Sequence, residues 1–228
     1  ELATSSSGAL SFDDDGPTLG VSANAGAAAA LALNLDETQG AVDRYAPGEA
    51  PDTAIDDDAA GVIARQTTAV VGGLSSLFTI SATTGADGGT LASGGSLSLQ
   101  LAGATGTPAS VATNLTATNG GAIHLEMGTG AAAGQVLGVD AAGDTVFVLA
   151  LVGEQLQLSL LEPLDHGDDG SDAFDDVLTL LTSGTGTALQ LQYEVTQADA
   201  DGDSLTRSAV VELATSSSGA LSFDDDGP

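Results

Sequence analysis

Alternation of apolar and polar residues is the clearest pattern in the chain. It occurs in residues 97–101, 155–160, 189–196 and 205–213. A period of two places every second side chain on the same face of a β-strand. In residues 189–196 this puts Leu191, Tyr193 and Val195 on one side, which we expect to face a core. These segments therefore predict strands with one buried face.

Other apolar segments have a less decisive pattern. Residues 146–152 are apolar without interruption, which indicates a strand buried on both faces or a short buried helix. Residues 18–35 are rich in alanine, but their leucines alternate with other residues, which favours a strand over a helix. In residues 172–182 apolar side chains at a helical spacing make a short helix compete with a strand. Many short strands between Gly-rich turns predict an all-β sandwich.

One stretch of the chain occurs twice. Residues 1–17 read ELATSSSGALSFDDDGP, and residues 212–228 repeat them without a change, at an offset of 211 residues. Because a repeat redefines the unit to be interpreted, we take residues 18–228 as one long repeat that follows the end of an identical predecessor. The junction is three consecutive Asp residues followed by Gly and Pro. The chain is therefore expected to belong to a tandem array.

The chain is strongly acidic, with 32 acidic residues against 3 basic ones and a net charge of −29. This charge excludes nucleic acid as a partner and excludes electrostatic docking on an anionic membrane. No apolar run is long enough for a membrane span, so we expect no membrane insertion. The absence of cysteine removes disulfides and thiolate metal ligands. Divalent cations remain as natural partners, and bound metal could stabilise a core that contains only 3% aromatic residues.

The acidic residues are concentrated in a few segments. Residues 59–161 contain five of them, whereas residues 36–58 contain eight and residues 162–176 contain seven. Two carboxylates about 4 Å apart repel by roughly 1 kcal/mol in water and by roughly 4 kcal/mol at an effective dielectric constant near 20. Clusters this dense are therefore either solvated loops or sites neutralised by cations.

The sharpest candidate for metal binding is Asp199-Ala200-Asp201-Gly202-Asp203, which directly follows the predicted strand 189–196. Alternating carboxylates around a Gly turn can direct several oxygens at one hard cation, and calcium accepts about six to eight oxygen ligands with loose geometry. The loop is not an EF-hand, because Ser204 and Val210 stand where that motif requires Gly and Glu. A polar hairpin turn is the alternative, since Asp and Gly also favour turns.

Other chemistry has weaker support. A zinc site at His166 would need a second nitrogen ligand, and the other histidine, His124, lies far along the sequence in an apolar segment. Calcium bound by Asp165 and Asp168, or a solvated loop, fits that acidic stretch better. Serine catalysis lacks a Gly-x-Ser-x-Gly motif, and a glycosidase carboxylate pair lacks an aromatic platform for sugar. We therefore expect no enzymatic activity.

Four phrases of the sequence resemble a known family. They are residues 35–38 (Leu-Asp-Glu-Thr), residues 160–166 (Leu-Leu-Glu-Pro-Leu-Asp-His), residues 196–204 with the closing strand after them, and the final Phe-Asp-Asp-Asp-Gly-Pro. In this order they resemble the calcium-dependent extender repeats of giant repeats-in-toxin adhesins that bacteria export by type I secretion. The resemblance covers most of residues 18–228. The Gly-Gly-x-Gly-x-Asp nonapeptide is absent, so the chain does not resemble the calcium-binding roll of such proteins.

The resemblance implies an immunoglobulin-like or cadherin-like β-sandwich whose acidic junctions bind Ca²⁺, as cadherin junctions do. Carried over by position, the implied ligands in the linker and its second copy are Asp13, Asp14, Asp15, Asp224, Asp225 and Asp226. The implied ligands within the repeat are Asp36, Glu37, Asp199, Asp201 and Asp203. We expect the first copy of the linker to be better ordered, because the second has lost its downstream partner.

Two architectures are compatible with a unit of this length. Two sandwiches in series are one. We favour the other, a split outer sandwich with an inserted β-rich subdomain, because Asp36, Glu37 and the Asp199 loop would then share one end. The predicted division is residues 1–12 as the tail of the preceding repeat, 13–17 as the calcium linker, 18–35 plus 183–223 as the outer sandwich, 36–182 as the insertion, and 224–228 as the next linker. The chain ends should then lie at opposite poles.

We expect a structural role. The sequence predicts a monomeric extender on the bacterial cell surface, with calcium ions and adjacent identical repeats as partners, which would hold a distal adhesive region away from the cell in adhesion and biofilm formation. The alternative is a module that binds a ligand, such as a glycan, through calcium. Exact duplication favours the extender, because near-identical tandem copies suit a spacer better than a receptor-binding head.

Overall fold

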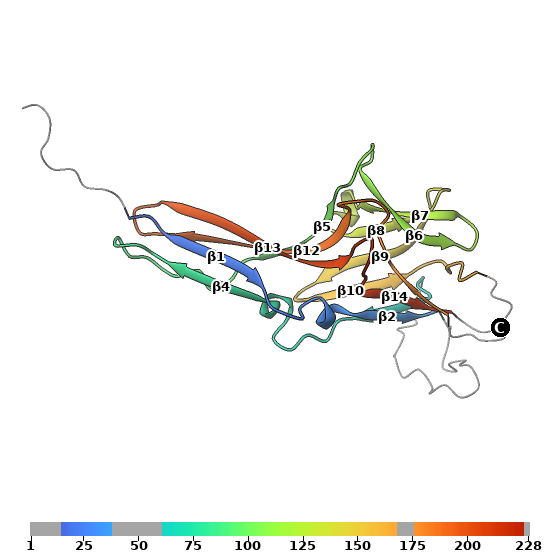
Figure 1. The fold of residues 1–228 in the computed structure, drawn as a ribbon, viewed down its shortest axis with the longest axis horizontal. Coiled ribbons are helices and arrows are strands. Elements are labelled where there is room, and N and C mark those ends of the chain that lie inside the picture. The colour runs from blue at the N-terminus through green and yellow to red at the C-terminus, as the bar shows by residue number, and fades with distance from the viewer. Residues whose placement is uncertain (1–14, 38–60, 168–175, 226–228) are drawn as a thin grey trace, which may run out of the picture.

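The structure is a computed structural model that describes residues 15–37, 61–167 and 176–225. These residues form an elongated, nearly all-β molecule with one narrow and one wide half (Figure 1). Three short 3-10 helices interrupt the strands: η1 (Ala29–Leu31), η2 (Leu74–Leu77) and η3 (Gly130–Ala132). No helix within the described ranges is long and apolar enough to cross a membrane. The all-β prediction is confirmed.

The narrow half consists of two sheets that face each other. One pairs β1 (Thr18–Ala23) with β4 (Phe78–Thr83), and the other has the order β13 (Ser204–Ala214), β12 (Ala188–Ala198), β5 (Ser96–Ala102). All of these neighbours are antiparallel. The rings of Phe78 and Tyr193 stack between the two sheets with their centroids 5.0 Å apart, so aromatic packing joins the layers.

The wide half contains the remaining strands. A six-stranded antiparallel sheet has the order β3 (Ala64–Thr67), β10 (Gln155–Leu160), β9 (Thr145–Val152), β8 (Val136–Val139), β7 (Gly121–Met127), β6 (Ser110–Ala117). A smaller sheet has the order β11 (Val177–Thr179), β14 (Leu221–Asp224), β2 (Leu33–Asp36). Phe147 and Phe223, both fully buried, meet between these sheets at a centroid distance of 5.4 Å.

The alternating segments are strands, as predicted. Residues 189–196 lie in β12, where Leu191 and Val195 are fully buried and Tyr193 is 3% exposed. The uninterrupted apolar run 146–152 lies in β9 and is a strand, not a helix. Val146, Phe147 and Leu149 are fully buried, but Val152 is 48% exposed, so the strand is not buried on both faces along its whole length.

Two segments differ from the predicted pattern. Residues 18–35 form two strands instead of one, because the chain turns at Gly26, whose φ is +79°, and passes through η1 before β2 begins. The helical spacing near residue 178 does not produce a helix in the described part of that segment, since Leu178 lies in β11 and pairs with Phe223 of β14. A strand partner elsewhere in the fold outweighs the local periodicity there.

The sheets cross the predicted division of the chain. Strands β4 and β5 lie inside the predicted insertion, yet they pair with β1 and β12 of the predicted outer sandwich. The first described strand, β1, lies in the narrow half, and the last, β14, lies in the wide half toward the other end of the molecule (Figure 1). The second copy of the duplicated stretch contributes β14, which pairs in parallel with β2 at the far end of the wide half.

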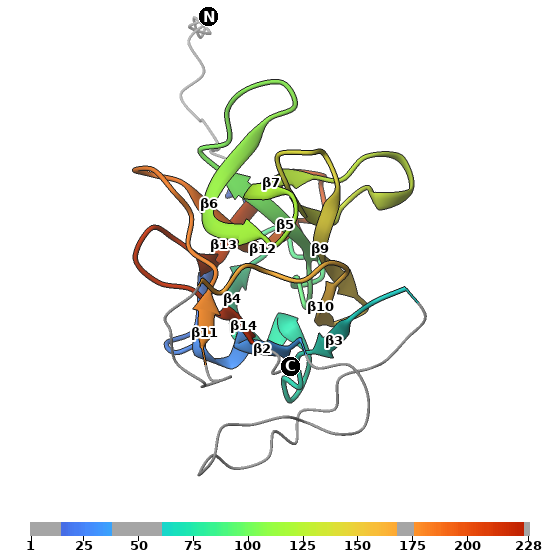
Figure 2. The same cartoon turned by 90° about the vertical axis from the view of Figure 1, so that its right-hand side faces the viewer.

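The two ends of the elongated molecule are built from different segments. The tip is the end of the narrow half, formed by Asp15, the loop of residues 84–92 and the loop of residues 199–203. The base is the opposite end, where β2 and β14 finish (Figures 1 and 2). The prediction that Asp36 and Glu37 share one end with the Asp199 loop is wrong, because the parallel pairing of β2 with β14 carries them to the base.

Candidate metal centre

The loop of residues 199–203 joins β12 to β13 at the tip and brings three carboxylates together. One carboxylate oxygen from each of Asp199, Asp201 and Asp203 lies within 4.8 Å of the others. Asp199 is 9% exposed, whereas Asp201 and Asp203 face solvent. The predicted grouping of these three acids is therefore found. Carboxylate oxygens at this spacing can share one hard cation.

One oxygen of Asp199 is used to build the turn itself. The Asp199 N–H donates to the Asp203 carbonyl at 3.0 Å. Asp199 Oδ1 accepts from the N–H groups of Gly202 and Asp203 at 3.2 and 2.8 Å. Gly202 has a φ of +109°, a conformation that favours glycine. The turn therefore needs Asp199 and Gly202 whether or not a metal binds.

The second oxygen of Asp199 has no role in the turn. Asp199 Oδ2 is buried and accepts no hydrogen bond. A buried acceptor without a donor costs free energy, and more so when it is charged. The close carboxylate of Asp201 raises the pKa of Asp199 and, reciprocally, contact with Asp199 lowers the pKa of Asp201. A cation bound between them would supply the positive partner that both carboxylates lack in the turn.

A second turn of the same length, residues 140–144, shows the hydrogen bonds that such a turn makes without a middle carboxylate. Residues 140–144 read Asp-Ala-Ala-Gly-Asp, against Asp-Ala-Asp-Gly-Asp in residues 199–203. Asp140 Oδ1 accepts from the N–H groups of residues 142, 143 and 144, and the Asp140 N–H donates to the residue 144 carbonyl at 3.0 Å. The other oxygen of Asp140 fills the space that a Cβ at Gly120 would occupy. The two turns therefore differ in the middle acid and in the surroundings of Oδ2.

The acidic linker reaches the same tip. The carbonyl oxygen of Asp15 lies so close to Gly85 that a Cβ there would overlap it, and Gly16 lies beside the Oδ2 atom of Asp203. The Ala200 N–H donates to the Gly88 carbonyl at 3.0 Å. Asp15 and the Asp199 loop thus both contact the loop 84–92. Asp13 and Asp14 lie outside the described residues.

The predicted ligands at the base have protein partners. Both carboxylate oxygens of Glu37 accept from the Leu164 N–H, at 3.1 and 3.2 Å. His166 Nε2 lies 3.3 Å from Glu37 Oε1, with both side chains almost fully buried. Asp36 is 6% exposed, and Asp224 Oδ2 accepts from the Asn34 side-chain amide at 2.5 Å. The hydrogen bonds of Glu37 and Asp224 thus join different segments of the base, and a role of these acids as calcium ligands stays a prediction.

The imidazole of His166 bridges two segments of the base. Its Nδ1 lies 2.9 Å from the Asp176 carbonyl, opposite the contact with Glu37. Burial alone lowers the pKa of His166, but the hydrogen bond and charge of Glu37, together with the charge of Asp225, outweigh it and raise the pKa. The other histidine, His124, lies 3.9 Å from Glu126 and not beside His166. The two histidines therefore form no common metal site.

The remaining predicted ligands are not brought to the Asp199 loop. Asp165 is exposed, and its Oδ1 accepts from the Gly167 N–H at 3.0 Å. Asp225 lies at the base, where its N–H donates to the Asp176 carbonyl at 3.3 Å. Asp168 and Asp226 lie outside the described residues. Because parts of both linker copies also lie outside them, the predicted difference in order between the copies stays a prediction.

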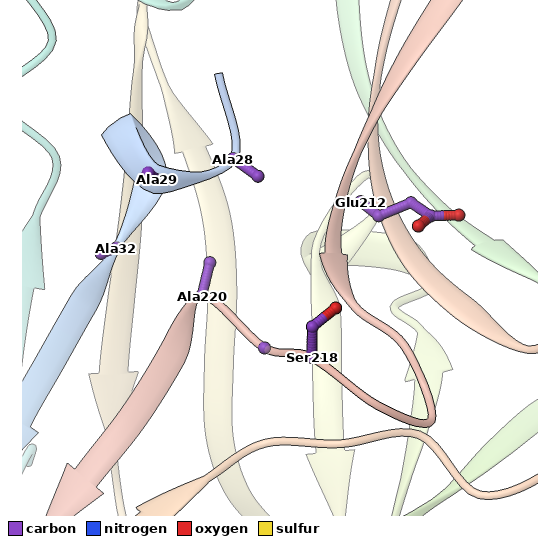
Figure 3. Close-up of a pocket in the computed structure, with 7 residues that line it drawn as sticks. Ala28, Ala29, Ala32, Glu212, Ser218 and Ala220 are labelled. Carbon is purple, nitrogen blue, oxygen red and sulfur yellow. The ribbon is translucent and has the colours of Figure 1, made fainter. Parts of the chain in front are cut away.

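A pocket between the two halves offers little chemistry. It is lined by the small side chains of Ala28, Ala29, Ala32, Ser218 and Ala220, by Gly219, and by Glu212. Figure 3 shows the Glu212 carboxylate directed away from the alanines. An enzyme site needs several polar groups that converge on one point. This pocket therefore gives no support to a catalytic role.

Comparison with known proteins gives one match. A family model described as Domain of unknown function (DUF5801) matches residues 32–212, which include the loop 199–203. No curated protein and no solved structure matches the chain.

Proposed function

The chain belongs to the DUF5801 family, a domain of unknown function, and we propose that it is a non-catalytic extender repeat stiffened by calcium at its junctions. The observation that carries the proposal is Asp199 Oδ2, which is buried without a donor inside a group of three carboxylates. The site adjoins Asp15 of the acidic linker through the loop 84–92. A cation there would stabilise the tip at the point where a preceding repeat joins.

The duplicated stretch supports a tight junction. Residue 226 is the copy of Asp15, so the second linker can be compared with the first. Asp224 and Asp225 are held at the base by β14 and by the Asp225 N–H bond to Asp176. Asp15 is held at the tip. In a tandem array only one peptide unit, about 3.8 Å between Cα atoms, separates these two anchored positions.

This spacing brings two acidic ends together. The base of one repeat carries Asp224 and Asp225, and the tip of the next carries Asp15 and the Asp199 loop. Like charges at such distances repel, and the repulsion grows as water is excluded between the ends. A divalent cation removes it. An array without cations should therefore bend at its junctions, and an array with cations should extend.

Calcium suits the available ligands better than other metals. The described group at the tip offers only oxygen ligands, and the chain contains no thiolate. Two of the three carboxylates are exposed and adjustable, which fits the variable coordination of calcium better than the strict octahedron of magnesium. Calcium sites of extracellular modules have dissociation constants of about 10⁻⁴ to 10⁻³ M. We infer an extracellular location on a bacterial surface, after export by type I secretion.

The proposal is tested by calcium and chelator on the 228-residue chain. At a calcium concentration of ten times the dissociation constant, mass action stabilises the fold by about 1.4 kcal/mol per site. Calorimetry should show a higher melting temperature with calcium than with chelator, and small-angle scattering of a two-repeat protein should show a longer particle. Equal melting temperatures and equal dimensions in both conditions would refute the proposal.

A further inference from the structure

We propose that the loop of residues 84–92 forms a wall of the Asp199 metal site, and that Gln197 is the positioning residue that holds this wall in place. The inference rests on the proposed calcium site and adds to it the loop 84–92, which contributes none of the three grouped carboxylates. It concerns how the site is kept ready to bind.

Gln197 is fully buried although it is polar. It stands two residues before Asp199, and its side chain points to the loop 84–92. Gln197 Oε1 accepts from the Ala92 N–H at 2.6 Å, and Gln197 Nε2 donates to the Thr90 carbonyl at 3.1 Å. Nε2 also donates to the Ala198 carbonyl at 2.6 Å. One side chain thus fastens the end of the loop to the last residues of β12.

The middle of the loop contacts the Asp199 backbone directly. The Gly88 carbonyl accepts from the Ala200 N–H at 3.0 Å. A Cβ at Gly89 would lie 3.2 Å from the Asp199 Cα, which is a tight contact, and Gly89 has a φ of +133°. The loop therefore covers Asp199 from one side with backbone, and glycine is needed for both the space and the conformation.

The start of the loop contacts the linker. Gly85, with a φ of +69°, lies against the carbonyl oxygen of Asp15. The same short loop therefore contacts the linker at one end, Asp199 in its middle and Gln197 at its other end. Because the three contacts lie within one short loop, we expect a change at one of them to affect the others.

The loop keeps Asp199 in its buried, binding-competent position. If the loop moves away from Asp199, the Asp199 carboxylate becomes exposed to water. A smaller fraction of the protein molecules then has the three carboxylates in the arrangement that binds calcium. The apparent affinity for calcium equals the affinity of the competent state multiplied by the fraction of molecules in that state. Since the buried hydrogen bonds of Gln197 favour the closed loop, their loss should lower that fraction.

The test is a calcium titration by calorimetry of the unaltered chain and of Gln197→Met. Methionine has a similar length but neither donates nor accepts as the amide does, so the Ala92 N–H and the Thr90 carbonyl lose their partner. We expect calcium affinity to fall by about tenfold or more. Amide hydrogen exchange at Ala92 and Ala200 should become faster in the same variant.

Two further variants make the result specific. Gly89→Ala disturbs the loop without touching Gln197 and should also weaken calcium binding. If Gln197→Met does not fold, the calcium affinity of Gly89→Ala decides the test. Thr68→Val is the matched control, because Thr68 is 3% exposed and its Oγ1 accepts from the Leu156 N–H at 3.0 Å in the wide half. It should lower the melting temperature in chelator without a change in calcium affinity.

The outcomes separate the two proposals. If the unaltered chain binds calcium and both loop variants bind it equally well, this inference is overturned and the calcium site stands. If the Thr68→Val control weakens calcium binding as much as the loop variants do, the effect is general destabilisation and the inference is overturned as well. If the unaltered chain binds no calcium, the proposed function fails and the inference fails with it.

Discussion

The substitution Asp201→Ala tests the metal site with little risk to the fold. It converts the loop 199–203 into Asp-Ala-Ala-Gly-Asp, the sequence that residues 140–144 already have. That second turn makes the same bonds from its first Asp, including the N–H to carbonyl bond of 3.0 Å across the turn. The variant should therefore keep the turn and lose one of three possible calcium ligands.

The expected size follows from mass action. At ten times the dissociation constant, calcium should stabilise the unaltered chain by about 1.4 kcal/mol. A chain of this length shifts its melting temperature by roughly 2–4 °C per kcal/mol, so the gain is about 3–6 °C. In Asp201→Ala this gain should nearly disappear. In chelator the variant should melt at or above the temperature of the unaltered chain, because the carboxylate that raises the pKa of Asp199 has been removed.

The assay is scanning calorimetry over a series of calcium concentrations and in chelator. Ala142→Asp is the converse control: it gives the second turn a third carboxylate, but the Asp140 side chain there lies against Gly120. It should create no calcium-dependent gain. A full calcium-dependent rise in the melting temperature of Asp201→Ala would show that the loop 199–203 is not the site.

Three further outcomes are expected. His166→Gln should lower the free energy of unfolding below about pH 6.5, the pKa of an unperturbed histidine. The difference in unfolding free energy from the unaltered chain should shrink as the pH rises through the raised pKa of His166. Urea unfolding across this pH range measures the difference, and a constant difference would contradict the prediction. Phe223→Ala removes a fully buried ring, so it should lower the free energy of unfolding by about 3–5 kcal/mol and the melting temperature by roughly 6–20 °C. Phe12→Ala, the same substitution in the first copy of the stretch, should change the melting temperature little. Equal losses would contradict the interpretation of residues 1–12 as the tail of a preceding repeat. At equal concentration, magnesium should raise the melting temperature less than calcium does, because magnesium gives up its water reluctantly; an equal rise would show a site without preference for calcium.

Local sequence predicts the strands of this chain well and their partners poorly. Period-two alternation identifies the buried face of β12, because it depends only on neighbours along the chain. The parallel pairing of β2 with β14 joins residues such as Asp36 and Asp224, which are far apart in the sequence. No local pattern contains that information. For this reason the three carboxylates of one loop could be predicted together, whereas the location of Asp36 and Glu37 could not.

The role of Gln197 could have been inferred from one signal in the sequence. Leu191, Tyr193 and Val195 occupy the inward positions of β12, and Gln197 continues the same series. A polar residue at a core-facing position must find hydrogen-bond partners, because burying it without them is costly. The sequence could not say that those partners are Thr90 and Ala92 of a loop about a hundred residues earlier, since the strand pairing decides which loop lies there.

The acidic side chains at the two ends of the repeat differ in their protein partners. This difference predicts which end loses its structure first when calcium is removed. At the base, Glu37 receives the Leu164 N–H and faces His166, so its charge has partners within the fold. At the tip, Asp199 Oδ2 has none. Removal of calcium should therefore speed amide hydrogen exchange in the loops 84–92 and 199–203 while β14 stays protected. Equal loss of protection at both ends would show that calcium acts on the whole fold and not through the tip.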